Sequence, residues 1–227
     1  MATRLDLEEQ EQLDSLRAFW GTYGNWITWA LVLVLGAFAA WNGWNWYQRD
    51  QGAKAGSMFD EMERAVRANE GDSAARIFAD MQSRHPRTAF TQQAGLLAAR
   101  VEADRNRDDA ARQALGWVAA SGGDATYAQV ARLRLAGMLL DAKQYEPALA
   151  ELARVEAPAF AALADDRRGD ILAAQGKADD ATAAYRKAWQ AMDSKVEYRS
   201  LIEAKLTALG ASPAAAAASG AASGAAT

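Results

Sequence analysis

The 227-residue chain has room for one soluble domain of ordinary size and additional segments. It contains no cysteine, which excludes a disulfide framework, a thiolate metal site and a thiol nucleophile. The net charge of −4 is concentrated in the first 17 residues and the rest of the chain is nearly neutral, so the basic surface that a nucleic-acid-binding protein needs is missing. Nucleic acid is therefore not an expected partner.

Residues 1–25 form an acidic leader. If the leader is helical, Leu5, Leu13, Leu16 and Trp20 share an apolar stripe. Two interpretations fit this pattern. The leader is either a solvated helical extension of the segment that follows or a helix that docks onto a partner.

Residues 26–47 are predicted to be a transmembrane helix in contact with the lipid bilayer. The chain has no charged residue from Ala18 to Gln48. A helix over residues 26–47 would be roughly 33 Å long, enough for a hydrocarbon core of about 30 Å. Tryptophans gather at its two ends, as expected for side chains at the membrane interface: Trp26, Trp29, Trp41, Trp44 and Trp46.

Two other interpretations of this segment fit less well. A signal peptide has a basic leader and a shorter apolar run, and a buried soluble helix rarely carries tryptophans at both ends. The positive charges that flank the segment leave its orientation undecided, because long domains cross membranes largely regardless of charge.

Residues 48–210 are predicted to form a helical-repeat domain, which makes the chain all-α. Pairs of helices recur in which small residues permit close approach and larger ones fill the gap, an arrangement that resembles the tetratricopeptide repeat. The clearest unit runs from Gly169 to Trp189. Alanines predicted as equivalent lie 36, 38 and 33 residues apart, and the residues expected to pack the repeats are Ala74, Phe78, Ala110, Ala136, Ala148, Gly169, Ala181 and Tyr185.

A closing helix is expected over residues 196–209, with Gly210 as its stop. It would cover the apolar face of the last repeat. Residues 211–227 are rich in alanine and lack bulky side chains, so they are expected to be disordered.

No catalytic constellation, cofactor site or metal site is predicted, so the chain is not expected to be an enzyme. His85 is the only histidine and is expected in a turn. The acidic pair Asp179-Asp180 suits the start of a helix, where negative charge favours the helix dipole, and adjacent acids such as Asp165-Asp166 point in different directions.

Stacked helix pairs instead create a concave binding groove. Six arginines on or near the predicted helices are candidates for it, and solvated outer faces are an equally good interpretation of them: Arg100, Arg105, Arg132, Arg134, Arg167 and Arg168.

An acidic leader, a tryptophan-rich span and a degenerate tetratricopeptide domain, in this order, resemble the ancillary SecYEG translocon subunit family of Gram-negative bacteria. The best matching stretches are EEQEQLDSLRAFW (Glu8–Trp20), the closing Trp46 of the span, and EAKLTAL (Glu203–Leu209). The alanine-rich tail and the alanine-rich repeats depart from the family pattern.

The resemblance implies a single-pass inner-membrane protein with a cytoplasmic N-terminus and a periplasmic domain. It also implies a non-catalytic adaptor whose partners are the SecYEG translocon, a membrane-anchored periplasmic chaperone of the prolyl-isomerase type and exported client proteins. The alternative is a scaffold for envelope assembly that uses the same domain to bind proteins.

Overall fold

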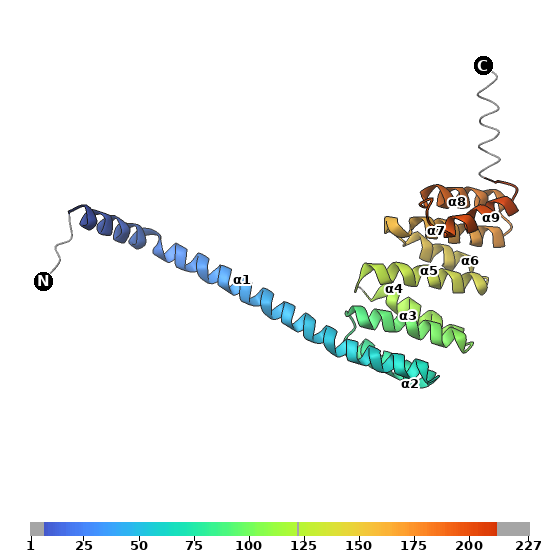
Figure 1. Ribbon diagram of the computed structural model, residues 1–227, viewed down its shortest axis with the longest axis horizontal. Coiled ribbons are helices and arrows are strands. Elements are labelled where there is room, and N and C mark those ends of the chain that lie inside the picture. The colour runs from blue at the N-terminus through green and yellow to red at the C-terminus, as the bar shows by residue number, and fades with distance from the viewer. Residues whose placement is uncertain (1–6, 122, 213–227) are drawn as a thin grey trace, which may run out of the picture. The chain divides into compact units, whose positions relative to one another are not determined.

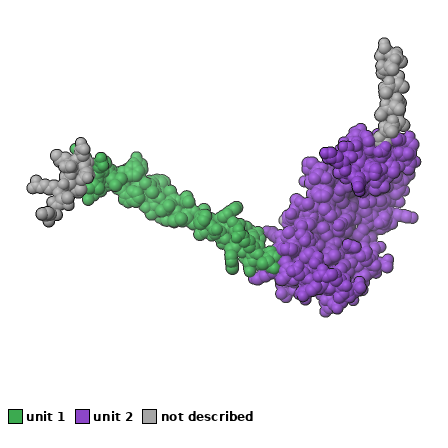
Figure 2. Space-filling model, in the orientation of Figure 1, with its two compact units in different colours: residues 1–53 green, residues 54–227 purple. Residues whose placement is uncertain are grey.

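The structure, a computed structural model, describes residues 7–121 and 123–212. Every regular element within these residues is a helix, which confirms the all-α prediction. The first residues of the leader and residues 213–227 of the predicted tail lie outside the described part of the chain. The chain divides into two compact units, residues 1–53 and 54–227 (Figure 2).

The described part of the first unit is a single helix, which exposes many apolar side chains along the uncharged residues 18–48. Helix α1 (Leu7–Arg67) contributes its residues up to 53 to this unit and its last turns to the second. Thr28 and Asn42 donate side-chain hydrogen bonds to the carbonyl oxygens of Gly24 and Phe38, at 2.7 and 2.9 Å. Such internal bonds lower the cost of placing polar groups in an apolar medium. By length and composition, this helix is able to cross a membrane.

The second unit is a stack of helix pairs, in which each helix from α2 to α8 contacts the next along the chain (Figure 1). The end of α1 pairs with α2, and three further pairs and a final helix follow. Their bounds are α2 (Gly71–Arg84), α3 (Ala89–Asp104), α4 (Asp108–Ala120), α5 (Ala125–Asp141), α6 (Tyr145–Ala153), α7 (Pro158–Ala174), α8 (Ala178–Ala191) and α9 (Tyr198–Ala208).

The same backbone turn joins the two helices of every pair. One residue in each turn has a positive φ of 58–77°: Asn69, Asn106, Lys143 and Gly176. The amide that follows each of them donates to a carbonyl five residues back, as in the bond from Glu70 N to Ala65 O. This is the Schellman arrangement that ends a helix. Separations of 37, 37 and 33 residues between these turns define the repeat.

A small residue stands at a fixed place in the second helix of each pair. Five residues after each positive-φ residue lies an alanine whose side chain is almost fully buried: Ala74, Ala111, Ala148 and Ala181. Ala110, the predicted packing residue, is only half-buried, and its neighbour Ala111 takes the equivalent place. The register of this repeat therefore differs by one residue from the one read in the sequence.

The other predicted packing residues lie in the interior of the stack. Phe78, Ala136 and Gly169 are buried, and a Cβ on Gly169 would overlap the ring of Tyr185. Close approach of α7 and α8 therefore requires glycine at this position.

Two clusters of buried side chains form the core. The larger runs from the end of α1 to α7, and the smaller joins α8 to α9 around Tyr185, Ile202 and Leu206. Helix α9 lies within the span expected for the closing helix, and Gly210 follows it with a φ of 75°. Ala211, placed in the tail by the sequence, packs against the smaller cluster.

Candidate protein-binding groove

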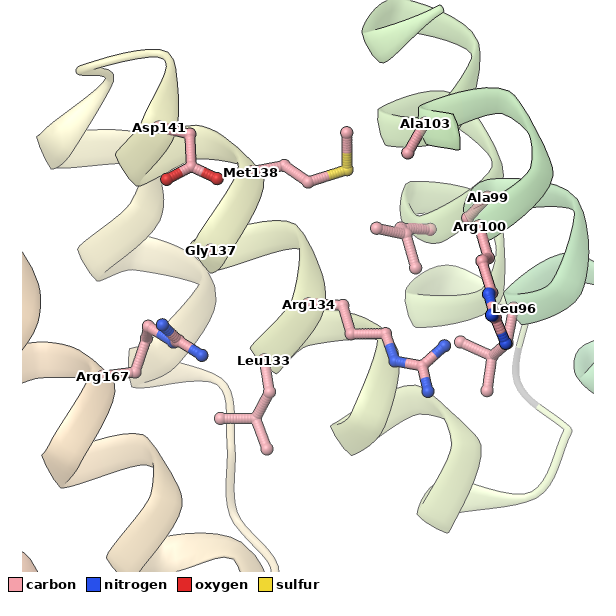
Figure 3. A pocket seen from close by; sticks show the side chains of 11 residues that line it. Leu96, Ala99, Arg100, Ala103, Leu133, Arg134, Gly137, Met138, Asp141 and Arg167 are labelled. Carbon is pink, nitrogen blue, oxygen red and sulfur yellow. The ribbon is translucent and has the colours of Figure 1, made fainter. Parts of the chain in front are cut away.

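An open groove of about 410 Å³ lies on the first helices of three successive pairs (Figure 3). Helix α3 contacts α5, and α5 contacts α7, so these three helices lie next to one another although α4 and α6 separate them in the chain. Repetition of the pair places equivalent helices side by side and thus builds this surface.

The groove has an apolar floor. Leu96 and Ala99 of α3 line it together with Leu133 and Met138 of α5. Leu96, Leu133 and Met138 are only partly buried, so part of their apolar surface is accessible to a partner. A floor of this kind suits recognition of an apolar side chain, and a methionine adapts to different shapes.

Three of the six candidate arginines line the groove. They are Arg100 on α3, Arg134 on α5 and Arg167 on α7 (Figure 3). Arg134 and Arg167 each precede the positive-φ residue of their own repeat by nine residues, so they occupy equivalent positions. A Cβ on Gly137 would lie 3.9 Å from Cζ of Arg167, which shows that this guanidinium lies against the bare backbone of α5.

The other three candidate arginines are not among the residues that line the groove. Arg132 donates to the carbonyl of Ala119 at 3.2 Å, and Arg168 lies 3.1 Å from the Asp165 carboxylate. Nη2 of Arg105 lies 2.8 Å from the carboxylate of Asp72. Hydrogen bonds from Arg105 and Arg107 hold the pKa of the Asp72 carboxyl below its usual value.

A network of charged groups on α7, α8 and α9 was not anticipated from the sequence. Lys205 of α9 donates to both carboxylate oxygens of Asp166 at 2.9 Å and lies 2.7 Å from Oδ1 of Asp170. The hydroxyls of Tyr198 and Tyr185 donate to Asp166 and Asp170, each at 2.8 Å. The network therefore joins α7, α8 and α9.

The adjacent acids Asp165 and Asp166 do point to different partners, as expected, but both are buried. Asp165 pairs with Arg168 and with Lys187 of α8, at 3.1 and 2.9 Å. Buried carboxylates that are fully paired fit a structural role rather than a catalytic one. His85 lies in the turn between α2 and α3 and is buried, and its carbonyl accepts hydrogen bonds from Thr88 and Thr91.

The predicted interface tryptophans are all exposed side chains of α1, with Trp26 79% exposed: Trp26, Trp29, Trp41, Trp44 and Trp46. Trp44 contacts the ring of Tyr47, and all five side chains remain more than half exposed. This exposure is compatible with an apolar environment supplied from outside the chain.

The groove floor of Leu96, Leu133 and Met138 was not predicted from the sequence, and neither were Gly137 and Asp141. Arg134 and Arg167 fall at one position only when the repeats are aligned on their positive-φ residues, which the structure supplies and the sequence does not.

Comparison with known proteins gives matches over almost the whole chain. The family model of a tetratricopeptide repeat-like domain matches residues 17–211. An ancillary SecYEG translocon subunit of Neisseria gonorrhoeae is 30% identical over 204 residues, which cover 89% of this chain and 98% of that protein. The protein of the same name from Escherichia coli is 28% identical over 185 residues, 81% of this chain and 86% of that protein.

A third relative with this name, from Haemophilus influenzae, is 26% identical over 184 residues, 81% of this chain and 90% of that protein. No solved structure matches. The match to the Neisseria protein takes in nearly all of that protein's length, and the family model includes both the apolar helix and the repeats. The chain therefore belongs to the ancillary SecYEG translocon subunit family, with a tetratricopeptide repeat-like domain.

Proposed function

We propose that this protein is a non-catalytic, membrane-anchored adaptor that associates with the SecYEG translocon and helps to pass exported proteins to periplasmic chaperones. The observation that carries the proposal is the match to relatives named for the translocon across both units, apolar helix and repeats alike. The groove on α3, α5 and α7 supplies a surface on which such an adaptor could bind a protein chain.

The proposed topology is a single pass through the bacterial inner membrane, with the N-terminus in the cytoplasm and the repeat domain in the periplasm. In this orientation the groove faces the compartment into which exported chains emerge. The apolar part of α1 would lie in the bilayer, with its terminal tryptophans at the two interfaces.

Two classes of periplasmic partner are part of the proposal. One is a membrane-anchored chaperone of the prolyl-isomerase type, and the other is the exported client itself. An open groove with an apolar floor and a charged rim fits transient binding of such chains, since partners that are handed on must be released.

Affinity purification of the full-length protein from native membranes in mild detergent tests the proposal. We expect SecYEG subunits and a membrane-anchored chaperone to be recovered by mass spectrometry. The matched control keeps residues 48–227 and replaces residues 26–47 with an unrelated transmembrane segment. Loss of SecYEG from this control would support docking through the span. Recovery of cell-wall or outer-membrane assembly proteins without SecYEG, from the unaltered protein, would refute the proposal in favour of an envelope scaffold.

A further inference from the structure

We propose that the groove on α3, α5 and α7 binds an extended acidic peptide segment, with carboxylates about three residues apart and apolar side chains between them. The inference rests on the proposed function in that it names the class of chain that the adaptor's groove would take. It is carried by the charge, the spacing and the floor of the groove.

The cations of the groove are available to a ligand. Arg134 is exposed and forms no hydrogen bond or ion pair with any other described residue. Arg100 lies 3.8 Å from Asp104, but both side chains are more than 70% exposed. An exposed pair of this kind is worth about 0–1 kcal/mol, so a ligand carboxylate can replace it at little cost.

Arg167 is also able to accept a second partner. It lies 3.2 Å from Asp170, a carboxylate that Lys205 and Tyr185 already engage. A guanidinium has five N–H donors, so most of those on Arg167 remain for a ligand. Asp141 is the one carboxylate among the described residues that line the groove. Three arginines against one acid favour a negatively charged ligand.

The spacing of the helices sets the spacing of the expected carboxylates. Helices in direct contact lie about 8–10 Å apart, and a chain in the extended polyproline II conformation advances about 3.1 Å per residue. A peptide that crosses α3, α5 and α7 therefore advances about three residues from one helix to the next. Carboxylates at this interval would meet Arg100, Arg134 and Arg167 in turn.

The floor explains why the peptide should also carry apolar side chains. Leu96, Leu133 and Met138 line the same groove as the arginines and have accessible apolar surface. In a polyproline II conformation, which has three residues per turn, side chains three residues apart lie on the same side of the peptide, so the carboxylates face the arginines while side chains between them turn toward the floor. Charge thus selects the ligand, and the apolar contacts strengthen its binding.

Fluorescence anisotropy of labelled peptides tests the inference, with the full-length protein in phosphatidylcholine nanodiscs. The probe is a nine-residue peptide with aspartates at its second, fifth and eighth positions and a leucine after each. One control peptide has asparagines in place of the aspartates, and another has the three aspartates adjacent to one another. We expect the probe to bind about tenfold more tightly than the asparagine peptide, since charge-assisted hydrogen bonds are roughly twice as strong as neutral ones. The probe should also bind more tightly than the peptide with adjacent aspartates.

The protein variant is Arg134→Gln combined with Arg167→Gln, and Arg134→Gln alone serves as a milder form because its side chain is exposed. The matched control is Arg186→Gln, an exposed arginine of α8 outside the groove. We expect the double variant to raise the Kd of the probe about tenfold and to weaken its dependence on salt, while Arg186→Gln leaves the Kd unchanged within twofold. Equal binding of the aspartate and asparagine peptides, or an unchanged Kd in the double variant, would overturn the inference.

Failure of the inference about the acidic peptide is distinguishable from failure of the proposed translocon function. If SecYEG co-purifies but the probe does not bind, the translocon association stands and the acidic ligand is wrong. If the probe binds through Arg134 and Arg167 but SecYEG is absent, the groove specificity stands and the translocon role is wrong.

Discussion

Asp166 of α7 and Lys205 of α9 are 39 residues apart in the chain and form an ion pair, with Nζ 2.9 Å from both carboxylate oxygens. Asp166 is 1% exposed. The pair therefore fixes the closing helix onto the last repeat through a buried charge, in addition to the apolar contacts of Ile202 and Leu206.

Replacing Lys205 with methionine is expected to destabilise the packing of α9. The change leaves the buried Asp166 carboxylate with only the Tyr198 hydroxyl as its side-chain partner, which should cost about 2–4 kcal/mol. Hydrogen exchange of the α9 amides in the full-length protein measures this as a loss of protection. Lys187→Met is the matched control, because Lys187 is 69% exposed and Asp165 keeps Arg168. The control should cost about 0–1 kcal/mol. Equal effects of the two changes would contradict a special role for the buried pair.

The same network predicts a loss of stability at alkaline pH. Burial, and the hydrogen bond to Asp166, raise the pKa of Tyr198 from 10.0 to about 12. Burial raises the pKa of Tyr185 as well, with its bond to Asp170 as the next cause. A raised pKa means that the folded protein holds the proton more tightly than the unfolded one, so stability falls as pH rises.

The contribution of Tyr198 is fully present below pH 10 and is lost between pH 10 and about 12. Protection of the α9 amides, corrected for intrinsic exchange, should therefore decline over this interval. In Tyr198→Phe the decline should be shallower, because one titrating group is gone. A decline as steep as in the unaltered protein would show that Tyr198 is not its source.

Two glycines, one on α7 and one on α4, should respond to alanine in opposite ways. Gly169→Ala places a Cβ in the ring of Tyr185 and should cost about 1–3 kcal/mol through overpacking. Gly116 of α4 has no atom within 4 Å of the Cβ position, so Gly116→Ala should stabilise its helix by about 0.5–1 kcal/mol. Thermal unfolding of the full-length protein in detergent compares them. A lower Tm for Gly116→Ala, or an unchanged one for Gly169→Ala, would be evidence against this packing.

The repeat turns give another pair of opposite effects at equivalent positions. Lys143 adopts a φ of 58°, and Gly176 adopts 77° at the same place in the last pair. Because a side chain is strained in this region, Lys143→Gly should stabilise by about 0.5–1 kcal/mol and Gly176→Lys should destabilise by about 1–2 kcal/mol. A Cβ at Gly176 meets no atom within 4 Å, so the second effect would come from the backbone alone. Relative to the unaltered protein, the Tm should therefore rise in Lys143→Gly and fall in Gly176→Lys.

Much of the fold could be predicted because it depends on local patterns. The all-α class, the apolar helix and the helix pairs follow from periodicity and from the absence of charge in residues 18–48. The register of the second helix pair, α3 and α4, could not be read locally, because Ala110 and Ala111 are adjacent and equally small. The turn at Asn106 decides in favour of Ala111, and a positive φ at a non-glycine residue leaves little trace in a sequence.

The site was less predictable because it depends on which helices meet. Arg100, Arg134 and Arg167 look no different in sequence from Arg105, Arg132 and Arg168, and only the contacts of α3 with α5 and of α5 with α7 separate the two sets. The pairing of Asp166 with Lys205 likewise depends on how α9 crosses α7. Helical spacing places Lys205 beside Ile202 and Leu206, which alone suggests a core face rather than an ion pair.

The absence of cysteine allows a direct test of the proposed topology, because a single introduced thiol is the only one in the chain. Ser194→Cys lies between α8 and α9 and Ser15→Cys lies in the leader, and both side chains are exposed. With the repeat domain in the periplasm, a membrane-impermeant maleimide added to cells with a permeabilised outer membrane should label Ser194→Cys at once. The same reagent should label Ser15→Cys only after the inner membrane is lysed. The reverse order of labelling would place the groove in the cytoplasm, where exported chains that have crossed the membrane cannot reach it.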